Sequence, residues 1–396
     1  MAHERAAGRE DGSEAVTGVA GPWPAVDRLL DRATIEGVVA HKLGPLAARH
    51  LRQQGRPIPP YLQAAERAAS LASRAAIPLL ERIRASCDQP LMVLKGPEVA
   101  LFYPDRTRQF SDIDILTTDA ATVHRALIAA GFVVVPDEDG FDYRNHHHEP
   151  PLKWPTIWLR IEVHARPNWP LSATPPSTDT LFAASQPSRL GVDGILAPDL
   201  HHHALLLAAH AWRDEPLHGL RQLLDVAAVT AGLDENQLDQ TANAFGLDRV
   251  WGTTKSTVDS LFYGQRRTIP LRSWARHLPA VRERTILGGH AARWVSGFWE
   301  LPLGAAAAQT ARVIASEIAP APGERWRDKL ARMSRAIRSP LAPVTRGSAD
   351  RLATPAAELG SCSAPAQDTA NLADERRNEG IDQTGVDHEH GSARRE

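Results

Sequence analysis

Two aspartates lie one residue apart in an otherwise apolar stretch, "FSDIDILT", residues 110–117. Successive side chains of a β-strand point to opposite faces, so Asp112 and Asp114 share one face and Ile113 and Ile115 share the other. Two neighbouring carboxylates repel each other, and water or a cation must stabilise them. The pattern alone leaves two interpretations open: the solvated face of an amphipathic strand, or a metal site.

A lysine–glycine pair and a third carboxylate stand near these aspartates in the sequence. Lys95 and Gly96 end the apolar run "PLMVLKG", and Glu162 lies in the strand-like segment "LRIEVHARPNW". Two carboxylates of one strand and a third from a neighbouring strand can hold two divalent ions, and Mg²⁺ prefers such oxygen ligands together with substrate phosphates. Two ions stabilise both the attacking and the leaving oxygen of an in-line displacement. Gly96 permits close approach of the backbone to a phosphate, and Lys95 supplies a point charge for it.

Three further side chains are candidates for the same site. Arg106 and Arg108 precede the aspartates, and their planar guanidinium groups can bind phosphate oxygens or form structural ion pairs. His164 follows Glu162 by two residues and shares its strand face. This histidine could orient a carboxylate, contact a substrate, or be a hydrogen-bonded structural residue. Both kinds of role stay open for all three.

The order Lys-Gly, Arg-x-x-x-Asp-x-Asp, Glu-x-His resembles the nucleotidyltransferases of the polymerase-beta-like superfamily. Within that superfamily, it looks like a bacterial branch known as an uncharacterised nucleotidyltransferase family. The resemblance covers most of residues 25–250. It implies an α+β fold, in which a small mixed sheet is flanked by helices, with a helical preamble before it and a helical domain after it. It also implies an enzyme that transfers a nucleoside monophosphate from a nucleoside triphosphate (NTP) to an acceptor and releases pyrophosphate.

The resemblance assigns roles to individual positions. The positions that match the catalytic and metal-binding carboxylates are Asp112, Asp114 and Glu162, of which the last would also accept the acceptor's proton. The nucleotide-binding positions are Lys95, Gly96, Arg106 and Arg108, with His164 in a supporting position beside the carboxylates. The implied cofactor is Mg²⁺ or Mn²⁺, and the implied substrates are an NTP, taken to be ATP, and an acceptor that the sequence does not identify.

The chain departs from the superfamily pattern at two points. Lys95 and Gly96 stand where the wider superfamily has a Gly-Ser pair, although a Lys-Gly pair is usual in this branch. Glu162 is one methylene longer than the aspartate common at its position. The missing serine supports an alternative interpretation, in which the chain is a catalytically inactive nucleotide- or partner-binding module on the same fold.

Composition narrows the class of protein. The 396 residues are 43% hydrophobic and 23% charged with a net charge of −2, which predicts a soluble globular protein without the basic surface of proteins that track nucleic acid. Cys87 and Cys362 lie far apart, which excludes a disulfide framework and suits a cytoplasmic location. The N-terminus lacks the apolar core of a secretory signal, and charged residues interrupt the longest Ala-rich stretch, so no membrane span is expected.

Shifts in composition and periodicity divide the chain into segments. The predicted organisation is a disordered leader (1–22), a helical segment (23–88), a nucleotidyltransferase core (89–172), a Pro-, Ser- and Thr-rich linker (173–198), a helical domain (199–340) and a disordered tail (341–396). Within the core, "FVVVP" predicts another strand, and "FDYRNHHHEPPLKW" with "TIWLRIEVHARPNW" predicts a hairpin-like pair. A helix is expected between Asp119 as N-cap and Gly131 as the stop.

Two histidine runs and one aspartate stand apart from this pattern. The runs at 146–148 and 201–203 suggest zinc, and a hydrolase built on His203 and His210 is a further alternative. These two share a helix face, but without a matched carboxylate they form an incomplete metal site, which favours structural roles. Asp225 interrupts an apolar helical stripe, as a buried partner of His210 or Trp212 or as a residue of a substrate pocket.

Overall fold

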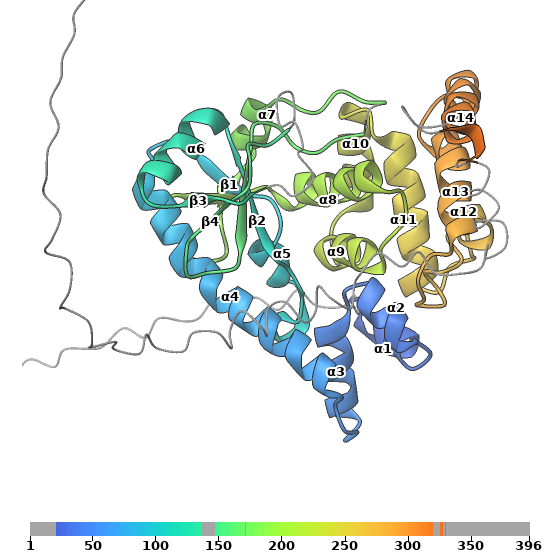
Figure 1. Cartoon of the computed structure of the whole chain (residues 1–396), viewed down its shortest axis with the longest axis horizontal. Coiled ribbons are helices and arrows are strands. Elements are labelled where there is room, and N and C mark those ends of the chain that lie inside the picture. The colour runs from blue at the N-terminus through green and yellow to red at the C-terminus, as the bar shows by residue number, and fades with distance from the viewer. Residues whose placement is uncertain (1–20, 137–146, 171, 320–324, 328, 330–396) are drawn as a thin grey trace, which may run out of the picture.

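The computed structural model describes residues 21–136, 147–170, 172–319, 325–327 and 329. The predicted leader, except for its last two residues, and the predicted tail lie outside the described residues. Residues 137–146, which include the first six residues of the predicted strand pair (141–146), also lie outside them. Within the described ranges, the chain forms one mixed sheet flanked by helices on both faces, which confirms the α+β prediction (Figure 1).

Seven strands of the described chain form the sheet, in the order β3-β4-β5-β2-β1-β7-β6. Their bounds are β1 (Leu91–Val93), β2 (Asp112–Thr117), β3 (Val133–Val134), β4 (Leu152–Lys153), β5 (Arg160–His164), β6 (Gln186–Pro187) and β7 (Ile195–Ala197). The central strand β2 pairs antiparallel with β1 and parallel with β5. This register sets Asp114 directly opposite Glu162, on neighbouring strands of the same sheet.

The alternation of side chains along β2 decides which face carries the acids. Ile113 and Ile115 are fully buried in an apolar cluster with the long helix α4 (Pro60–Ser86) and with α6 (Ala120–Ala129). Leu116 packs in a second cluster with residues of α8 (Leu200–Asp214) and α9 (Leu220–Thr230). Since residues two apart share a face, the aspartates point with Leu116 toward the helical second half.

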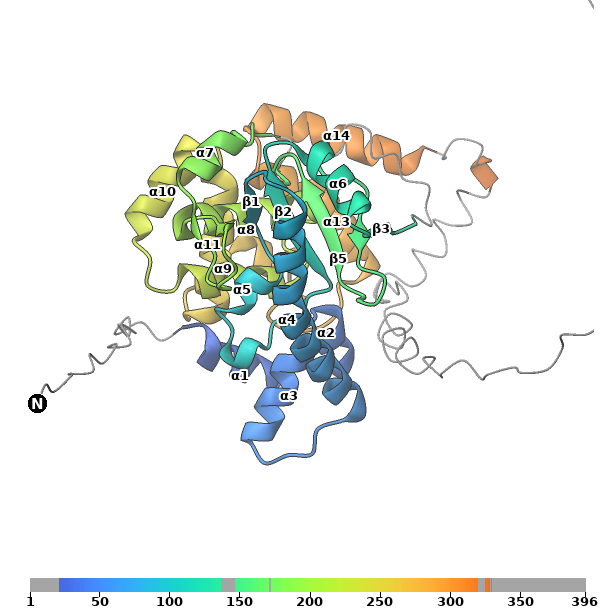
Figure 2. The ribbon, with the colours of Figure 1, turned by 90° about the vertical axis from the view of Figure 1, so that its left-hand side faces the viewer.

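Four helices precede the sheet: α1 (Trp23–Leu30), α2 (Ile35–Ala40), α3 (Gly44–Gln53) and α4. The first part of the helical segment predicted over residues 23–88 is divided into three short helices. Thr34 starts one of them as an N-cap, because its hydroxyl accepts a hydrogen bond from the Gly37 N–H at 3.0 Å. The α3 and α4 helices then pack against each other, with α3 at the lower end of the view in Figure 2.

The predicted helix between Asp119 and Gly131 is confirmed as α6. The Asp119 carboxylate accepts a hydrogen bond from the Thr122 N–H at 3.0 Å, as an N-cap does. Gly131 follows the helix with a φ of +99°, a conformation that stops helices and favours glycine. The short helix α5 (Pro97–Ala100) follows β1 directly.

The segment expected to be a linker contributes to the sheet. Residues 173–198 contain α7 (Thr178–Ala183) and the strands β6 and β7, and β7 pairs in parallel with β1. Ile195 and Ala197 are each 1% exposed, so this edge belongs to the core. Strands of two or three residues are too short to show periodicity amid Pro and Ser, which is why composition favoured a linker.

The second half is helical, as the sequence predicts. After α8 and α9 come α10 (Glu235–Ala244), α11 (Asp248–Phe262), α12 (Ile269–Arg272), α13 (Ile286–Val295) and α14 (Leu303–Ile318). Among the described helices, none combines the length and apolar character needed to cross a bilayer.

Candidate active site

A cavity of about 440 Å³ lies between the acidic face of the sheet and helices α8 and α9, a volume typical of small-molecule sites. Its walls carry both acids and cations. The acids are Asp112, Asp114, Glu162 and Asp225, and the cations are Lys42, Lys95, Arg108, Arg213 and Arg221. Histidines and amides complete the lining: His147, His148, His164, His210, Asn168 and Gln222.

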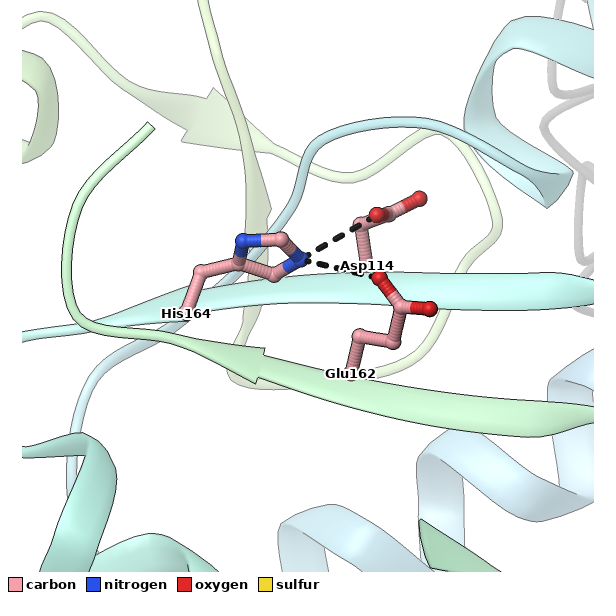
Figure 3. A group of neighbouring side chains, drawn as sticks. All are labelled: Asp114, Glu162 and His164. Carbon is pink, nitrogen blue, oxygen red and sulfur yellow. Dashed lines mark hydrogen bonds and ion pairs between the residues drawn. The ribbon is translucent and has the colours of Figure 1, made fainter. Parts of the chain in front are cut away.

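The side chains of Asp114, Glu162 and His164, which all line this cavity, converge on one another (Figure 3). Each offers a ligand atom within 4.8 Å of the other two. His164 Nε2 lies 3.1 Å from Asp114 Oδ1 and 3.6 Å from Glu162 Oε2. The two acids face each other across β2 and β5, and His164 follows Glu162 by two residues on the same strand face.

The two oxygens of Asp114 have different surroundings. Oδ1 accepts hydrogen bonds from His164 and from Lys95, whose Nζ lies 3.1 Å away. Oδ2 is buried and has no hydrogen-bond partner. A buried carboxylate oxygen has lost its hydration. Unless a cation or a hydrogen-bond donor contacts it, this desolvation costs on the order of 1–3 kcal/mol or more.

Charges around the acids keep them ionised. Burial alone would raise the pKa of Asp114, but the Lys95 ammonium and the hydrogen bond from His164 hold it well below its usual range. Burial likewise opposes ionisation of Glu162, yet the contact with His164 lowers its pKa below the ordinary value. For His164, burial lowers the pKa, and the hydrogen bonds to Asp114 and Glu162 outweigh it and raise the pKa.

Asp112 lines the same cavity but stands apart from the group of three. It is the first residue of β2, and its position opposite Arg160 places it two residues nearer the strand's start than Asp114. Both predicted aspartates therefore face one cavity, while only Asp114 lies within 4.8 Å of Glu162 and His164.

Lys95 and Gly96 lie at the turn between β1 and α5. Besides Asp114, the Lys95 ammonium contacts His210, with Nζ and Nε2 separated by 3.0 Å. Gly96 has a φ of +61°, and a Cβ built on it would lie 2.6 Å from the Asp112 carbonyl oxygen. The glycine is thus required by close packing against β2, a reason that the sequence interpretation, which invoked phosphate approach, did not include.

Arg108 forms a buried ion pair with Asp225. Its Nε and one terminal nitrogen donate to the two Asp225 oxygens, each at 2.8 Å, and the Tyr103 hydroxyl donates to Oδ1 at 2.6 Å. Another Arg108 nitrogen donates to the Gly96 carbonyl at 3.3 Å. Asp225 is therefore a buried polar partner, as one interpretation held, but its partners are Arg108 and Tyr103 and not His210 or Trp212.

Arg106 is not brought to this cavity. It lines a separate hollow with residues of α3 and α4, although only one residue separates it from Arg108. The phosphate-binding roles of Arg106 and Arg108 both stay predictions. Arg106 does not line the cavity of the carboxylates, and the charge of Arg108 is paired with Asp225.

The histidines of α8 have hydrogen-bonding roles. His203 Nε2 lies 2.7 Å from the Leu94 carbonyl oxygen, so this nitrogen carries a proton and donates. His210 contacts Lys95 through Nε2, and its Nδ1 lies 3.2 Å from Asn168 Nδ2. Among the described residues, the only group of three or more suited to a metal is Asp114, Glu162 and His164, and it contains neither His203 nor His210.

Several cavity residues were missed by sequence reasoning. They are Lys42, Asn168, Arg213, Arg221 and Gln222. His210 was expected to have a structural role or, in the hydrolase alternative, to bind zinc, and not to line this cavity. Lys42 carries one signal, a φ of +55° that is uncommon for a lysine, but a dihedral angle is not visible in a sequence. The other residues reach the cavity because helices pack on the sheet, and no local pattern in the sequence signals that packing.

The donor set suits a hard divalent cation. Asp114 Oδ2 is a buried oxygen without a partner, and the Glu162 carboxylate lies beside it with Asp112 in the same cavity. Mg²⁺ and Mn²⁺ are bound by such carboxylates, and the walls leave space for a phosphate-bearing substrate. The residues present therefore fit the metal that the resemblance implies.

A mixed sheet with paired acids on its central strand, a third acid on the parallel neighbour and a helical half over them defines a nucleotidyltransferase-like fold. A family model described as "Uncharacterised nucleotidyltransferase" matches residues 30–262, more than half of the chain, and the chain belongs to this family. Membership implies an NTP substrate. No curated protein matches the chain.

Proposed function

We propose that this protein is a metal-dependent nucleotidyltransferase that moves a nucleoside monophosphate from an NTP, with ATP as the first candidate, to an acceptor. The acceptor's nucleophilic atom forms a bond to the α-phosphorus, the bond from that phosphorus to the β-phosphate oxygen breaks, and pyrophosphate leaves. The observation that carries the proposal is the buried Asp114 carboxylate, which has one oxygen held by Lys95 and His164 and the other without a partner.

Three carboxylates hold the metal in this proposal: Asp112, Asp114 and Glu162. A bound Mg²⁺ or Mn²⁺ would supply charge neutralisation on the phosphates and polarise the α-phosphate. Lys95 and His164 fix the orientation of Asp114, because both donate to the same oxygen and leave the second one for the ligand. Side-chain geometry of this kind lowers the reorganisation needed when substrate binds.

Glu162 is our candidate for the general base. Its side chain is 23% exposed and faces the cavity, so an acceptor can reach it, whereas the Asp114 side chain is 1% exposed. Its lowered pKa keeps it ionised at neutral pH, ready to take the acceptor's proton as the new bond forms.

The cations of the cavity hold the triphosphate and the leaving pyrophosphate. Lys95 lies 3.1 Å from Asp114 Oδ1, and Lys42, Arg213 and Arg221 line the cavity from the helical segments. Such groups compensate charge that moves onto pyrophosphate as the bond breaks. Arg108 contributes indirectly, since its pair with Asp225 ties α9 to the turn at Gly96.

The test uses the full-length protein with a cell extract as the acceptor pool, Mg²⁺ or Mn²⁺, and each of four NTPs labelled at either the α- or the γ-phosphate. The expected result is α-label in an acceptor and γ-label in pyrophosphate, with both abolished in Asp114→Asn. Asp88→Asn is the matched control, because Asp88 is fully exposed at the end of α4 and outside the cavity.

Two outcomes contradict the proposal. Transfer of γ-label to an acceptor indicates a kinase and not a nucleotidyltransferase. Binding of an NTP without any label transfer, equal in wild type and Asp114→Asn, supports the non-catalytic nucleotide-binding module.

A further inference from the structure

A second hollow, of about 390 Å³, lies between α3, α4 and the turn that follows α5. Four arginines and two acids line it, a charge pattern that the catalytic proposal does not use. The charged residues are Arg49, Arg52, Arg67, Arg106, Glu66 and Asp105, with the Ser70 hydroxyl beside them.

Only two of the four arginines are paired. Arg49 Nε donates to Asp105 at 3.0 Å, and Arg52 binds Glu66 through two parallel hydrogen bonds. Within the described residues, neither Arg67 nor Arg106 has an ion pair, and both are exposed. The hollow therefore holds two positive charges in excess, on guanidinium groups that keep their hydrogen-bond donors available.

Backbone strain accompanies Arg106. Asp105 has φ +51° and ψ +24°, and Arg106 has φ +53°, so two consecutive residues other than glycine are left-handed. Each such residue costs about 1–2 kcal/mol, and strain of this kind gathers at functional positions. The turn closes on itself, because the Arg106 and Thr107 N–H groups donate to the carbonyls of Tyr103 and Pro104.

This turn separates two sites. Thr107 lines the arginine hollow, whereas the next residue, Arg108, lines the catalytic cavity and pairs with Asp225. Arg106 and Arg108 thus line different hollows although only one residue separates them in the chain. The hollow is consequently a site of its own and not an extension of the catalytic cavity.

We propose that the arginine hollow binds a phosphate-bearing ligand. Planar guanidinium groups match phosphate oxygens in two parallel hydrogen bonds, and Arg67 and Arg106 supply two such groups over one concave surface. Two kinds of ligand carry such phosphate groups: a free polyphosphate, and a single-stranded nucleic acid through its backbone. This site stands independently of the reaction proposed above.

The test is isothermal titration calorimetry of the full-length protein in EDTA, with inorganic pyrophosphate as one probe and a short single-stranded oligonucleotide as the other. The variant Arg67→Ala/Arg106→Asn removes both unpaired guanidinium groups, and Asn tolerates the left-handed backbone at 106. Arg74→Ala is the matched control, since Arg74 is exposed on α4 seven residues from Arg67 and lies outside the hollow. Thermal unfolding of each variant checks that it is folded, and Arg67→Glu serves as a single-site alternative.

Binding of at least one probe to wild type and to Arg74→Ala is expected, with affinity at least 10-fold weaker in the double variant. Lys95→Ala should keep this binding, which separates the hollow from the catalytic cavity. Tighter and salt-dependent binding of the oligonucleotide identifies nucleic acid as the source, and tighter binding of pyrophosphate identifies a free polyphosphate. Wild type that binds neither probe, or a double variant that binds both as wild type does, overturns the proposal.

Discussion

Two buried aspartates face the same cavity from different regions of the molecule, Asp114 from the sheet and Asp225 from the helical half. Both carry a lowered pKa because cations outweigh the effect of burial, Lys95 for Asp114 and Arg108 for Asp225. Asp225 uses both oxygens, which accept from Arg108 and Tyr103. Asp114 uses one oxygen only, and the other is buried without a partner.

The difference shows that burial of a carboxylate does not by itself mark a functional group. A fully satisfied carboxylate such as Asp225 stabilises the contact between helix and sheet, because its desolvation is offset by two cationic hydrogen bonds and one hydroxyl. A half-satisfied one such as Asp114 retains an unmet electrostatic requirement that a cation can fulfil. The comparison predicts that the first controls stability and the second controls chemistry.

The largest effect is expected when the satisfied pair is broken. Asp225→Leu leaves the Arg108 guanidinium, 3% exposed, without its counterion, and we expect the free energy of unfolding to fall by about 3–5 kcal/mol. Urea unfolding followed by circular dichroism measures this change. A guanidinium stays protonated in proteins even without its counterion, so the variant has no route to neutralise this buried charge by deprotonation.

The matched variant removes the whole group at once. Tyr103→Phe/Arg108→Leu/Asp225→Leu eliminates all the buried polar atoms of the pair, so it should recover most of the lost stability. A triple variant as unstable as Asp225→Leu would show that Asp225 acts through contacts other than Arg108 and Tyr103.

Asp114→Asn should give the opposite profile. We expect nucleotidyl transfer to fall by more than about 100-fold, because even groups that only support metal ligands commonly contribute 10- to 100-fold. Its unfolding free energy should change by less than half as much as in Asp225→Leu, since Lys95 has a 16% exposed side chain on the cavity and can be solvated. The measurements are the labelled-NTP assay and urea unfolding of the same preparation.

A control for Asp114 comes from its supporting residue. His164→Gln keeps a donor near Asp114 Oδ1 and should retain more activity than His164→Ala, while neither should match the loss in Asp114→Asn. Equal activity of Asp114→Asn and wild type would remove the distinction between the two carboxylates.

The dependence of stability on pH offers a third test. Both aspartates have pKa values below the ordinary one, so their stabilisation is present above about pH 4 and is lost only in stronger acid. A loss of stability between pH 6.5 and 5 must therefore come from other groups. Three buried histidines, His41, His203 and His277, are the candidates, because burial lowers the pKa of each. For His41, burial and the nearby His218 lower the pKa to about 4.

The sign follows from the hydrogen bonds of His41. Its Nδ1 accepts from the Leu220 N–H and its Nε2 donates to the Arg282 carbonyl, so the ring is neutral when folded and gains a proton more readily when unfolded. His41 should therefore contribute about 2 kcal/mol to a decline of stability as the pH falls from about 6.5 to 5. Urea unfolding at pH 7 and pH 5 measures the decline, and His41→Gln should reduce it by that amount. An unchanged decline in the variant would assign it elsewhere, such as to His277.

Much of the sheet could be predicted from the sequence because β2 and β5 show alternation, and α6 carries both a capping residue and a stop. The segment containing β6 and β7 could not, since strands this short depend on pairing with β1 and not on their own pattern. Thr34 is a residue type that often caps a helix N-terminus, so a new helix after it could have been predicted. The helical spacing of apolar residues continues across Thr34, however, and favoured one longer helix.

The site divides in the same way. Asp114, Glu162, His164 and Lys95 come together because strand register and a strand end place them, and both are visible as local patterns. Arg213 and Arg221 enter through the packing of α8 and α9 on the sheet, which depends on contacts between residues about 100 apart in the chain.

The smallest effect is expected from a substitution of Gly96, which contacts both Arg108, the partner of Asp225, and the strand that carries Asp114. The Gly96 carbonyl accepts from Arg108, and its Cα side packs on the Asp112 carbonyl, 2.6 Å from where a Cβ would lie. Gly96→Ala therefore has two energetic costs, the positive φ and a displacement of β2. Gly55→Ala has only the cost of its positive φ of +66°, because no atom lies within 4 Å of the added Cβ. We expect the unfolding free energy to fall by about 1–2 kcal/mol more in Gly96→Ala than in Gly55→Ala. Because the displacement moves the start of β2, transfer activity should also fall in Gly96→Ala and stay unchanged in Gly55→Ala. Equal effects of the two substitutions on stability and on activity would mean that the contact with Asp112 does not constrain the turn.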